Sequence, residues 1–473
     1  MKVNLPTVGP ILGFTTHDQA RLFLRGVDER HGTELRRCFG VVRWKRASSN
    51  TWSKPLYNKL SPNFDMTGVF ALQGLSKATK YDYQAGWFFA EAELDKIQGL
   101  DEKLLEWADP DNKNGWSFTT GTPDPNAARS YIVGSCRYLL RLFGGSWFDD
   151  RGDKAFRSVL EQIEEKGMPV HGLLMVGDQI YADDLNFLAP DARMDEFLQR
   201  YRTAFSQEHI RKLMSQVPTY MILDDHEIED NWPSKASTED RVTLYPHAIH
   251  SYQIYQCSHS PLFEADDKGR IDGTLTHFWY NFTDGCADWF VMDSRTERLL
   301  TPTRLQMIND VQLKGLLSWL SDGSGRVKFV VTSVPFFPDL RSESSDKWTA
   351  FAAQREAILE CIRSKKIRKV IFVSGDVHCS FSSLLTLSSD PDFAVNTIVS
   401  SSFFWPYPHT SEADFVFDSP LKGTGERQYV SKRTSPVVTT DNFARIDADP
   451  TEVRVTFFER KGARLGKPVR IAF

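Results

Sequence analysis

The chain is organised around one short stretch, Phe372-Val373-Ser374-Gly375-Asp376-Val377-His378-Cys379. It begins inside a continuous apolar run, residues 370–373, which is typical of a parallel β-strand covered on both faces. The run stops at a Ser-Gly pair, and Asp376 and His378 then supply side chains of the kind that metal sites and acid–base sites use. Because open α/β sheets present ligands outside the carboxyl ends of their strands, this stretch predicts one wall of a functional site.

Three earlier stretches have the same construction. Apolar runs at residues 131–133, 173–176 and 220–223 lead directly into polar residues of the ligand type. One apolar strand followed by Gly-Asp is usually a turn. Four such strand ends need another explanation, since buried carboxylates, imidazoles and thiols need partners. Together the four ends supply seven candidate side chains: Cys136, Asp178, Tyr181, Asp225, His226, Asp376 and His378.

Length and composition bound the class of protein. The 473 residues exceed one typical core, so two or three domains are expected. A net charge of -5 predicts no specific nucleic-acid binding, and six scattered cysteines do not form a disulfide framework. The chain has no run of about 18 apolar residues and no apolar leader region, so no transmembrane segment is expected. As written, the protein is expected in the cytoplasm, or outside the cell if a leader was removed.

The first part of the chain reads as all-β. Alternating runs at residues 20–25, 39–44 and 81–87, separated by turn residues, suit a small antiparallel sandwich. A Gly-Leu pair followed by Lys-Tyr-Asp-Tyr resembles a fibronectin type III domain. We therefore expect a fibronectin III-like sandwich over residues 1–122 and a linker over residues 123–130.

From residue 131 onward, strands alternate with helices, which indicates an α/β domain over residues 131–473. Helices are predicted over residues 153–166, after Asp191 as N-cap, and over residues 303–320. The tail returns to strands. An aromatic loop at residues 403–409 either packs against the domain, which we favour, or stacks on an aromatic group of a substrate.

The seven candidate side chains suit a two-metal site. A carboxylate shared by two cations holds them close together, and Asp178 and Asp376 are the natural residues for such bridging or anchoring. A thiolate from Cys136 and a phenolate from Tyr181 on one ion favour iron. The oxygen-rich remainder suits a harder cation such as Ca²⁺, Mg²⁺ or Mn²⁺. His226, if it does not bind metal, can protonate a leaving group.

Several of these residues also have a purely structural interpretation. Cys136 alone would more often be a buried small hydrophobe, and Tyr181 alone would more often be core. Arg137 and Arg295 also follow strands and are predicted to bind phosphate oxygens, although Arg295 equally suits pairing with a carboxylate. Asp224 is expected to support a ligand or cap a turn rather than bind metal.

Four motifs in this order resemble the PhoD-like alkaline phosphatases: Gly-Ser-Cys, Gly-Asp-Gln-Ile-Tyr-Ala-Asp, Asp-Asp-His-Glu-Ile-Glu-Asp-Asn-Trp and Ser-Gly-Asp-Val-His. These enzymes are relatives of the purple acid phosphatases within the calcineurin-like metallophosphoesterases. Residues 8–13 and 348–355 resemble the same family, so the resemblance covers nearly the whole chain. It implies an αββα metallophosphoesterase core with iron and calcium, for which Mn²⁺, Zn²⁺ or Mg²⁺ would be substitutes. By this resemblance, Cys136, Asp178, Tyr181 and His378 would hold Fe³⁺; Asp178, Asp225 and Asp376 would hold Ca²⁺, with Asn231 a weaker candidate; and His226 would be the catalytic histidine.

The motifs depart from the wider superfamily in three places. The usual first Asp-x-His is absent and Cys136 stands in its place, the usual Gly-His-x-His is Gly375-Asp376-Val377-His378, and the usual Asn before the catalytic histidine is Asp225. Each change makes the site more anionic, which argues against a plain di-zinc site.

We expect metal-dependent hydrolysis of small-molecule phosphate esters. A metal-bound hydroxide would attack phosphorus in line while His226 assists the departing alkoxide. Monoesters and diesters both remain open, including a phosphodiesterase that acts on nucleotides or a phosphopolymer. Two other classes also stay open. One is a non-catalytic binding or adhesion protein with a relict phosphoesterase domain, and the other is a hydrolase with Cys136 as nucleophile, which would survive a chelator but not a thiol alkylator.

Overall fold

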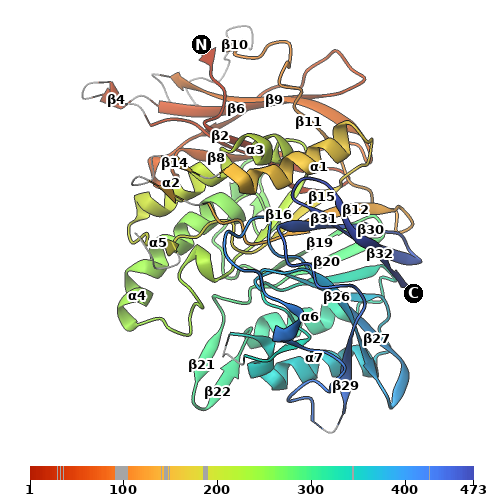
Figure 1. The fold of residues 1–473 in the computed structure, drawn as a ribbon. Coiled ribbons are helices and arrows are strands. Elements are labelled where there is room, and N and C mark those ends of the chain that lie inside the picture. Colours follow the sequence, from red (N-terminus) through yellow and green to blue (C-terminus); the bar gives the residue numbers. More distant parts are fainter. Residues whose placement is uncertain are drawn as a thin grey trace.

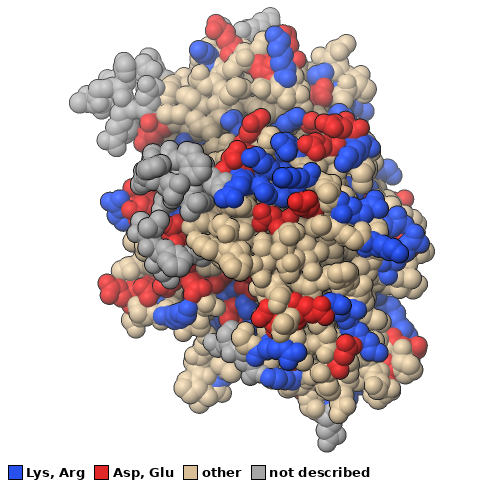
Figure 2. All heavy atoms as spheres, in the orientation of Figure 1, with Lys and Arg blue, Asp and Glu red and all other residues tan. Residues whose placement is uncertain are grey.

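The strands of the first part of the chain gather at one end of the molecule, and the larger sheets and helices of the rest lie beside them (Figure 1). On the face drawn in Figure 2, acidic and basic side chains are interspersed and separated by broad areas of other residues. Every described helix is too short or too polar to cross a lipid bilayer. The computed structural model describes residues 1–28, 30–31, 34–35, 37–90, 105–139, 141–142, 147–148, 150–184, 190–342, 346–425 and 427–473.

The N-terminal strands form two antiparallel sheets around one apolar core. Leu22, Val42 and Tyr83 come from different strands of the two sheets, and all three are fully buried in the same cluster. The alternating runs of the sequence therefore form a two-sheet sandwich. One sheet has the order β2 (Val8–Thr15), β3 (Ala20–Arg25), β8 (Thr67–Leu72), and the other has the order β11 (Ser117–Thr119), β9 (Lys80–Ala90), β6 (Arg37–Arg46), β7 (Leu56–Lys59).

Two larger sheets follow, and each combines parallel and antiparallel strands. The first has six strands in the order β16 (Thr219–Ile222), β15 (Gly172–Val176), β12 (Arg129–Gly134), β30 (Asn442–Ala448), β31 (Glu452–Glu459), β32 (Arg464–Ala472). The second has seven strands in the order β19 (Tyr280–Asp284), β20 (Ala287–Val291), β23 (Val327–Val331), β25 (Val370–Ser374), β27 (Asp390–Val399), β26 (Phe381–Leu387), β29 (Tyr429–Arg433). The pairs β12–β15, β15–β16, β20–β23, β23–β25 and β25–β27 are parallel.

The two larger sheets pack face to face between helices. The ring of Tyr131 lies 4.8 Å from that of Trp289, and the ring of Tyr220 stacks on Phe282 at 3.8 Å. The layers therefore run helix, sheet, sheet, helix, and the expected mixed α/β class is confirmed. Helices α1 (Lys154–Glu164), α2 (Met194–Phe205), α3 (Glu208–Met214) and α5 (Leu244–Tyr252) pack on the six-stranded sheet, and α6 (Asp310–Leu320) and α7 (Ala352–Ser364) pack on the seven-stranded sheet.

Short elements complete the fold. Two-stranded pairs are β1 (Lys2–Val3) with β10 (Glu106–Trp107), β4 (Arg30–His31) with β5 (Glu34–Leu35), β13 (Arg141–Leu142) with β14 (Trp147–Phe148), β17 (Glu264–Ala265) with β18 (Ile271–Asp272), β21 (Leu299–Thr301) with β22 (Arg304–Gln306), and β24 (Asp339–Leu340) with β28 (Phe415–Val416). Short helices are η1 (Pro62–Phe64), η4 (Asp150–Asp153), η6 (Asp225–Glu227), α4 (Thr238–Val242), η7 (Gln253–Cys257), η8 (Trp348–Phe351) and η9 (Glu412–Asp414).

Two predicted helices begin later than the sequence suggested. Asp191 is not the N-cap of α2, because its carboxylate accepts a hydrogen bond from Arg200 Nε at 2.6 Å and the helix begins at Met194. The stretch 303–320 starts with strand β22 of a hairpin, and α6 begins only at Asp310, where the Asn309 side chain caps it. In both cases a local polar contact sets the boundary.

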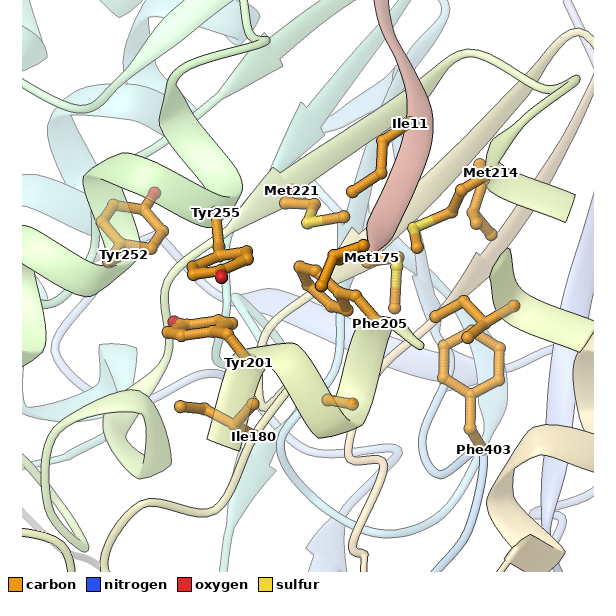
Figure 3. Close-up of a cluster of buried hydrophobic side chains, with 14 of the residues drawn as sticks. Ile11, Met175, Ile180, Tyr201, Phe205, Met214, Met221, Tyr252, Tyr255 and Phe403 are labelled. Atoms are coloured by element: carbon orange, nitrogen blue, oxygen red, sulfur yellow. The ribbon is translucent and has the colours of Figure 1, made fainter. Parts of the chain in front are cut away.

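The N-terminal sandwich is packed against the helix layer of the six-stranded sheet. Figure 3 shows Ile11 of β2 in the same buried cluster as Met175, Met214 and Met221. This contact buries apolar surface from both parts of the chain, which stabilises their association.

Asp65 adds an ionic link at the same junction. It follows η1 in the sandwich, its side chain is 4% exposed, and it pairs with Arg25 of β3 at 3.1 Å. It also accepts hydrogen bonds from Arg202 of α2 and from the hydroxyl of Tyr255 in η7. Burial raises the pKa of Asp65, but the hydrogen bonds from Arg202, Arg25 and Tyr255 outweigh it and hold the pKa below its ordinary value.

We expect Asp65→Asn to lower the free energy of unfolding by about 2 kcal/mol at neutral pH, because an amide cannot replace a buried carboxylate between two guanidinium groups. The pKa is lower in the folded chain than in the unfolded one. The contribution of the carboxylate is therefore complete above about pH 4 and is lost as the pH falls through its folded pKa. Urea denaturation at neutral pH and at about pH 3 should show the gap between wild type and variant narrowing in acid.

Asp392→Asn is the matched control, because Asp392 is 79% exposed and pairs with Arg368 on the surface. It should change stability by no more than about 0.5 kcal/mol at either pH. If the difference in free energy of unfolding between wild type and Asp65→Asn stayed constant from neutral to acid pH, the carboxylate charge would not be what stabilises the junction.

Candidate metal centre

Four strands bring the predicted ligands to one edge of the two sheets. β12, β15 and β16 are parallel neighbours, so their carboxyl ends share an edge, and they lead into Cys136, Asp178 and Asp225. β25 of the facing sheet leads into Asp376 and His378. The ligand candidates therefore come from both larger sheets.

The backbone turns sharply at four of these positions. Cys136, Asp178, Asp376 and His378 have φ angles of 53°, 54°, 70° and 51°, in the left-handed region that non-glycine residues rarely adopt. Such conformations cost about 1–3 kcal/mol each and persist where the surrounding structure holds them, often at functional sites. The turn after β25 also needs Gly375, because a Cβ there would lie 2.2 Å from Ser135 Oγ.

The first ligand group combines a thiol, a carboxylate and an imidazole. Cys136, Asp178 and His378 each offer a donor atom, and these atoms all lie within 4.8 Å of one another. Cys136 Sγ lies 3.1 Å from Asp178 Oδ2, and the hydroxyl of Tyr181 lies 3.4 Å from the same oxygen. The four residues predicted as iron ligands are thus brought together.

Two further groups are linked to the first through shared residues, since the second shares Asp178 with the first and the third shares Asp225 with the second. Asp178, Asp225 and His226 form one, and Asp224, Asp225 and Asp376 form the other, each with donor atoms within 4.8 Å of one another. Asp178 and Asp225 therefore belong to two groups each, which is the arrangement that bridging carboxylates of a two-metal site have. Asp224, expected only to support a ligand, lies inside the third group.

The donor atoms fit metal ions. Asp178 Oδ1 and His378 Nε2 are buried and have no hydrogen-bond partner among the described residues, whereas buried polar atoms are nearly always paired. Burial, with the charges of His226 and His409, lowers the pKa of His378 to about 3. Its imidazole is therefore neutral, which is the form that binds metals.

Burial and like charges raise the pKa values of the acidic groups. Burial is the largest cause of the strongly raised pKa of Asp178, and the charge of Asp224 adds to it. Burial and then Asp178 likewise raise the pKa of the Cys136 thiol. Burial raises the pKa of Asp376 to about 7 even though Lys347 opposes this shift. Because cations lower the pKa of neighbouring carboxylates and thiolates, the cluster suits positive ions.

His226 forms a pair with a carboxylate that the sequence analysis did not single out. Its Nδ1 lies 2.8 Å from Asp183 Oδ2, and its ring stacks on Tyr181 with centroids 4.4 Å apart. Burial lowers the pKa of His226, but the charges of Asp225, Asp183 and Asp178 outweigh it and raise the pKa well above its ordinary value. Asp183 therefore holds the imidazole in a defined orientation, and the surrounding carboxylates favour its charged form.

Glu227 connects the two loops that carry candidate ligands after β15 and β16. Its carboxylate accepts hydrogen bonds from the backbone N–H groups of Asp178, Gln179 and Asp224 at 3.2, 2.6 and 2.9 Å. The loops after β15 and β16 are therefore fixed to each other. The run Asp-Asp-His-Glu marks this residue in the sequence, but only the folded chain shows what it holds.

Asn231 lies near the centre, and its candidacy as a ligand of the second metal stays a prediction. Its backbone N–H donates to Asp225 Oδ2 at 2.6 Å, and its side-chain amide donates to Asp230. The backbone N–H of Asn231 thus helps to orient Asp225, and its side-chain NH₂ group binds Asp230.

Arg137 does not reach the centre, contrary to its predicted role. Its guanidinium is fully buried, donates to the carbonyl of Ala204 in α2 and lies 5.5 Å above the ring of Phe156 in α1. Burial lowers the pKa of Arg137 to about 10. The side chain packs among helices on the outer face of the sheet, so the prediction that it binds phosphate oxygens does not fit this structure.

Arg295 lies beside the centre but faces carboxylates. It is fully buried and forms ion pairs with Asp224 and Asp346. Its Nη2 lies 3.3 Å from Asp225 Oδ1 and 3.6 Å from Asp376 Oδ1. Of its two interpretations, pairing with carboxylates fits this position, and contact with a phosphate does not.

Lys347 is a charged group that no motif marked. Its ammonium contacts Asp376 Oδ2 and lies 2.6 Å from Asp346 Oδ2. Its only signal in the sequence is its place directly before the stretch that begins at Trp348.

The aromatic loop at residues 403–409 packs against the centre. The indole of Trp405 stacks on the His378 ring with centroids 3.6 Å apart, and His409 Nδ1 lies 2.8 Å from the His378 carbonyl oxygen. The favoured interpretation of this loop, packing, therefore holds for Trp405 and His409.

Comparisons with known proteins agree on one family. A family model described as PhoD-like phosphatase matches residues 142–457. Alkaline phosphatase D of Bacillus subtilis (strain 168) is 25% identical over 218 residues, which are 41% of this chain and 36% of that protein, so the match spans little more than a third of the relative. The solved structure of PhoD superposes with a TM-score of 0.68 and 15% identity, over 99% of this chain and 89% of its own.

Proposed function

The chain belongs to the PhoD-like phosphatase family, and on that premise we propose that it is a metal-dependent phosphoric ester hydrolase. The observation that carries the proposal is the convergence of the strand ends on two buried ligand atoms, Asp178 Oδ1 and His378 Nε2, which have no hydrogen-bond partner in the described part of the chain. A relict site would be expected to have lost part of such a set, which speaks against a purely binding or adhesive protein.

The donor chemistry divides the centre into two parts. Cys136, Asp178, Tyr181 and His378 would hold iron, because thiolate, phenolate and imidazole suit a transition metal. Asp178, Asp225 and Asp376 would hold calcium or a related hard cation. Bound together, such cations supply an activated water and neutralise phosphate oxygens.

His226 would act as the general acid. In this role it donates a proton to the oxygen of the leaving alcohol. Asp183, bound to Nδ1, orients the ring and leaves Nε2 for the substrate. Arg295 would act indirectly, by fixing Asp224 and Asp346 beside the centre.

The alternative with Cys136 as nucleophile has less support. Its thiol is fully buried between Asp178 and the hydroxyls of Ser135 and Ser401. A nucleophilic cysteine needs a neighbouring base or cation that favours the thiolate. Asp178 and the imidazole of His378 lie close to the thiol, but burial and the charge of Asp178 raise the pKa of Cys136, which disfavours the thiolate that a nucleophile needs.

We expect turnover of a chromogenic phosphomonoester or of the matching phosphodiester when iron and calcium are supplied, and loss of turnover with a chelator. Parallel assays of both esters, with thiol alkylation as a third arm, measure this. Activity that survives chelation but not alkylation would favour the cysteine hydrolase. Absence of both metal and turnover would favour the binding protein.

We also infer the domain organisation. The sandwich of three and four strands is of fibronectin III-like type and ends near residue 122, residues 123–130 are the linker, and the catalytic domain runs over residues 131–473. The last sandwich strand ends at Thr119 and β12 begins at Arg129, which supports a division between them, although residues 129 and 130 of the expected linker already belong to β12.

A further inference from the structure

The solvent-facing side of the centre is bordered by few residues. The side chains of Asp376 and His226 are 10% and 9% exposed, and that of Lys347 is 15% exposed. In contrast, Asp224 and Arg295 are fully buried. Solvent therefore reaches Lys347, Asp376 and His226, as well as the partly exposed His378 and Asn231, but not Asp224 or Arg295.

The two arginines nearest the centre already form ion pairs with carboxylates. Arg295 and Arg298 are both fully buried and both pair with Asp346. Besides metal ions, only a cationic side chain that can reach the substrate can bind the oxygens of a dianionic phosphate. Of these charged groups, Lys347 is the one with solvent access.

Lys347 is held in place by two carboxylates. Asp346, anchored by the two buried arginines, and Asp376 take two of its three N–H donors. The ammonium has no third acceptor among the described residues. A lysine ammonium is charged at neutral pH, and two adjacent carboxylates favour the charged form.

We propose that Lys347 binds a non-bridging phosphate oxygen and gives the site a preference for phosphate monoesters over diesters. This inference rests on the proposed function. A monoester carries a second negative charge that a diester lacks, so one added ammonium favours the monoester. Since Lys347 also shares the Asp376 carboxylate with any cation bound there, the same charge opposes cation binding.

Lys347→Met is the direct test, because it removes the charge and keeps a stem of similar length. We expect kcat/KM for a monoester to fall about 100-fold and that for the matching diester to fall less than about 10-fold. The Kd of inorganic phosphate for the metal-loaded protein, measured by calorimetry, should rise by a similar factor of about 100. The affinity of the chelator-treated protein for calcium should instead increase.

Two comparisons separate substrate binding from structure. Lys347→Arg keeps the charge and should restore most of the phosphate affinity, whereas a residue that only supports the loop would not move phosphate and calcium affinity in opposite directions. Lys212→Met on α3, whose side chain is 54% exposed and pairs with Glu164, should leave every readout unchanged.

An equal loss for monoester and diester, or an unchanged phosphate Kd, would overturn the inference while the wild type still hydrolyses esters. Failure of the proposed function has a different signature, since the wild type would then hydrolyse neither ester. The phosphate and calcium titrations would still report on Lys347 in that case.

Discussion

Asp178→Asn should abolish metal binding and catalysis together. Asp178 belongs to two ligand groups, and its Oδ1 is buried without a hydrogen-bond partner among the described residues. An amide keeps the size of the side chain but loses the charge and one of the two oxygens that a bridging ligand needs. We expect turnover to fall at least about 1,000-fold, since loss of a bridging ligand removes several kcal/mol of transition-state stabilisation.

Elemental analysis of the purified variant, beside its activity, measures both effects. Asp288→Asn is the matched control, because Asp288 is also buried but lies in β20, where it binds Thr283 at 2.7 Å. It should keep metal and activity. An Asp178→Asn protein that is metal-free and fully active would refute the assignment of this centre.

His226→Gln should lower kcat by about 10²–10⁴-fold for esters of alkyl alcohols, because an alkoxide needs a proton as it leaves. A nitrophenolate is a stable anion, so esters of nitrophenol should lose much less. Comparing kcat for the two leaving groups measures the role of the proton donor, independently of how much enzyme is active.

The metal content of His226→Gln decides between the two roles of this residue. His226 lies in one ligand group, with Asp178 and Asp225, but its Nδ1 is bound to Asp183. Unchanged metal content with a leaving-group-dependent loss supports the general acid. Loss of metal with equal effects on both leaving groups would make it a ligand instead. His247→Gln, a partly exposed helix position bound to the carbonyl of Ala192, is the control.

The strand ends could be predicted because their signal is local. A buried strand appears as an apolar run, and the residue at which the run stops is visible in the sequence. Parallel neighbours such as β12, β15 and β16 then bring these stops to one edge without further information. The sequence alone therefore places Cys136, Asp178 and Asp225 together.

Side-chain direction beyond the strand end could not be predicted. The φ of 53° at Cys136 turns the chain, and Arg137 then packs outward against Phe156. Nothing in the residue order reports that angle. The role of Lys347 could not be predicted for a related reason, since its contact with Asp376 joins positions 29 residues apart with helix α7 and strand β25 between them.

The candidate ligands of the centre follow strands of two different sheets, Cys136, Asp178 and Asp225 of one and Asp376 and His378 of the other. Cations bound by residues of both sheets would cross-link the two layers, so the free energy of cation binding would also stabilise the folded state. At a free cation concentration of one hundred times Kd, this linkage adds about 2.7 kcal/mol. The concentration of these ions would then affect the stability of the folded protein as well as its rate of turnover. A shortage of ions would lower both.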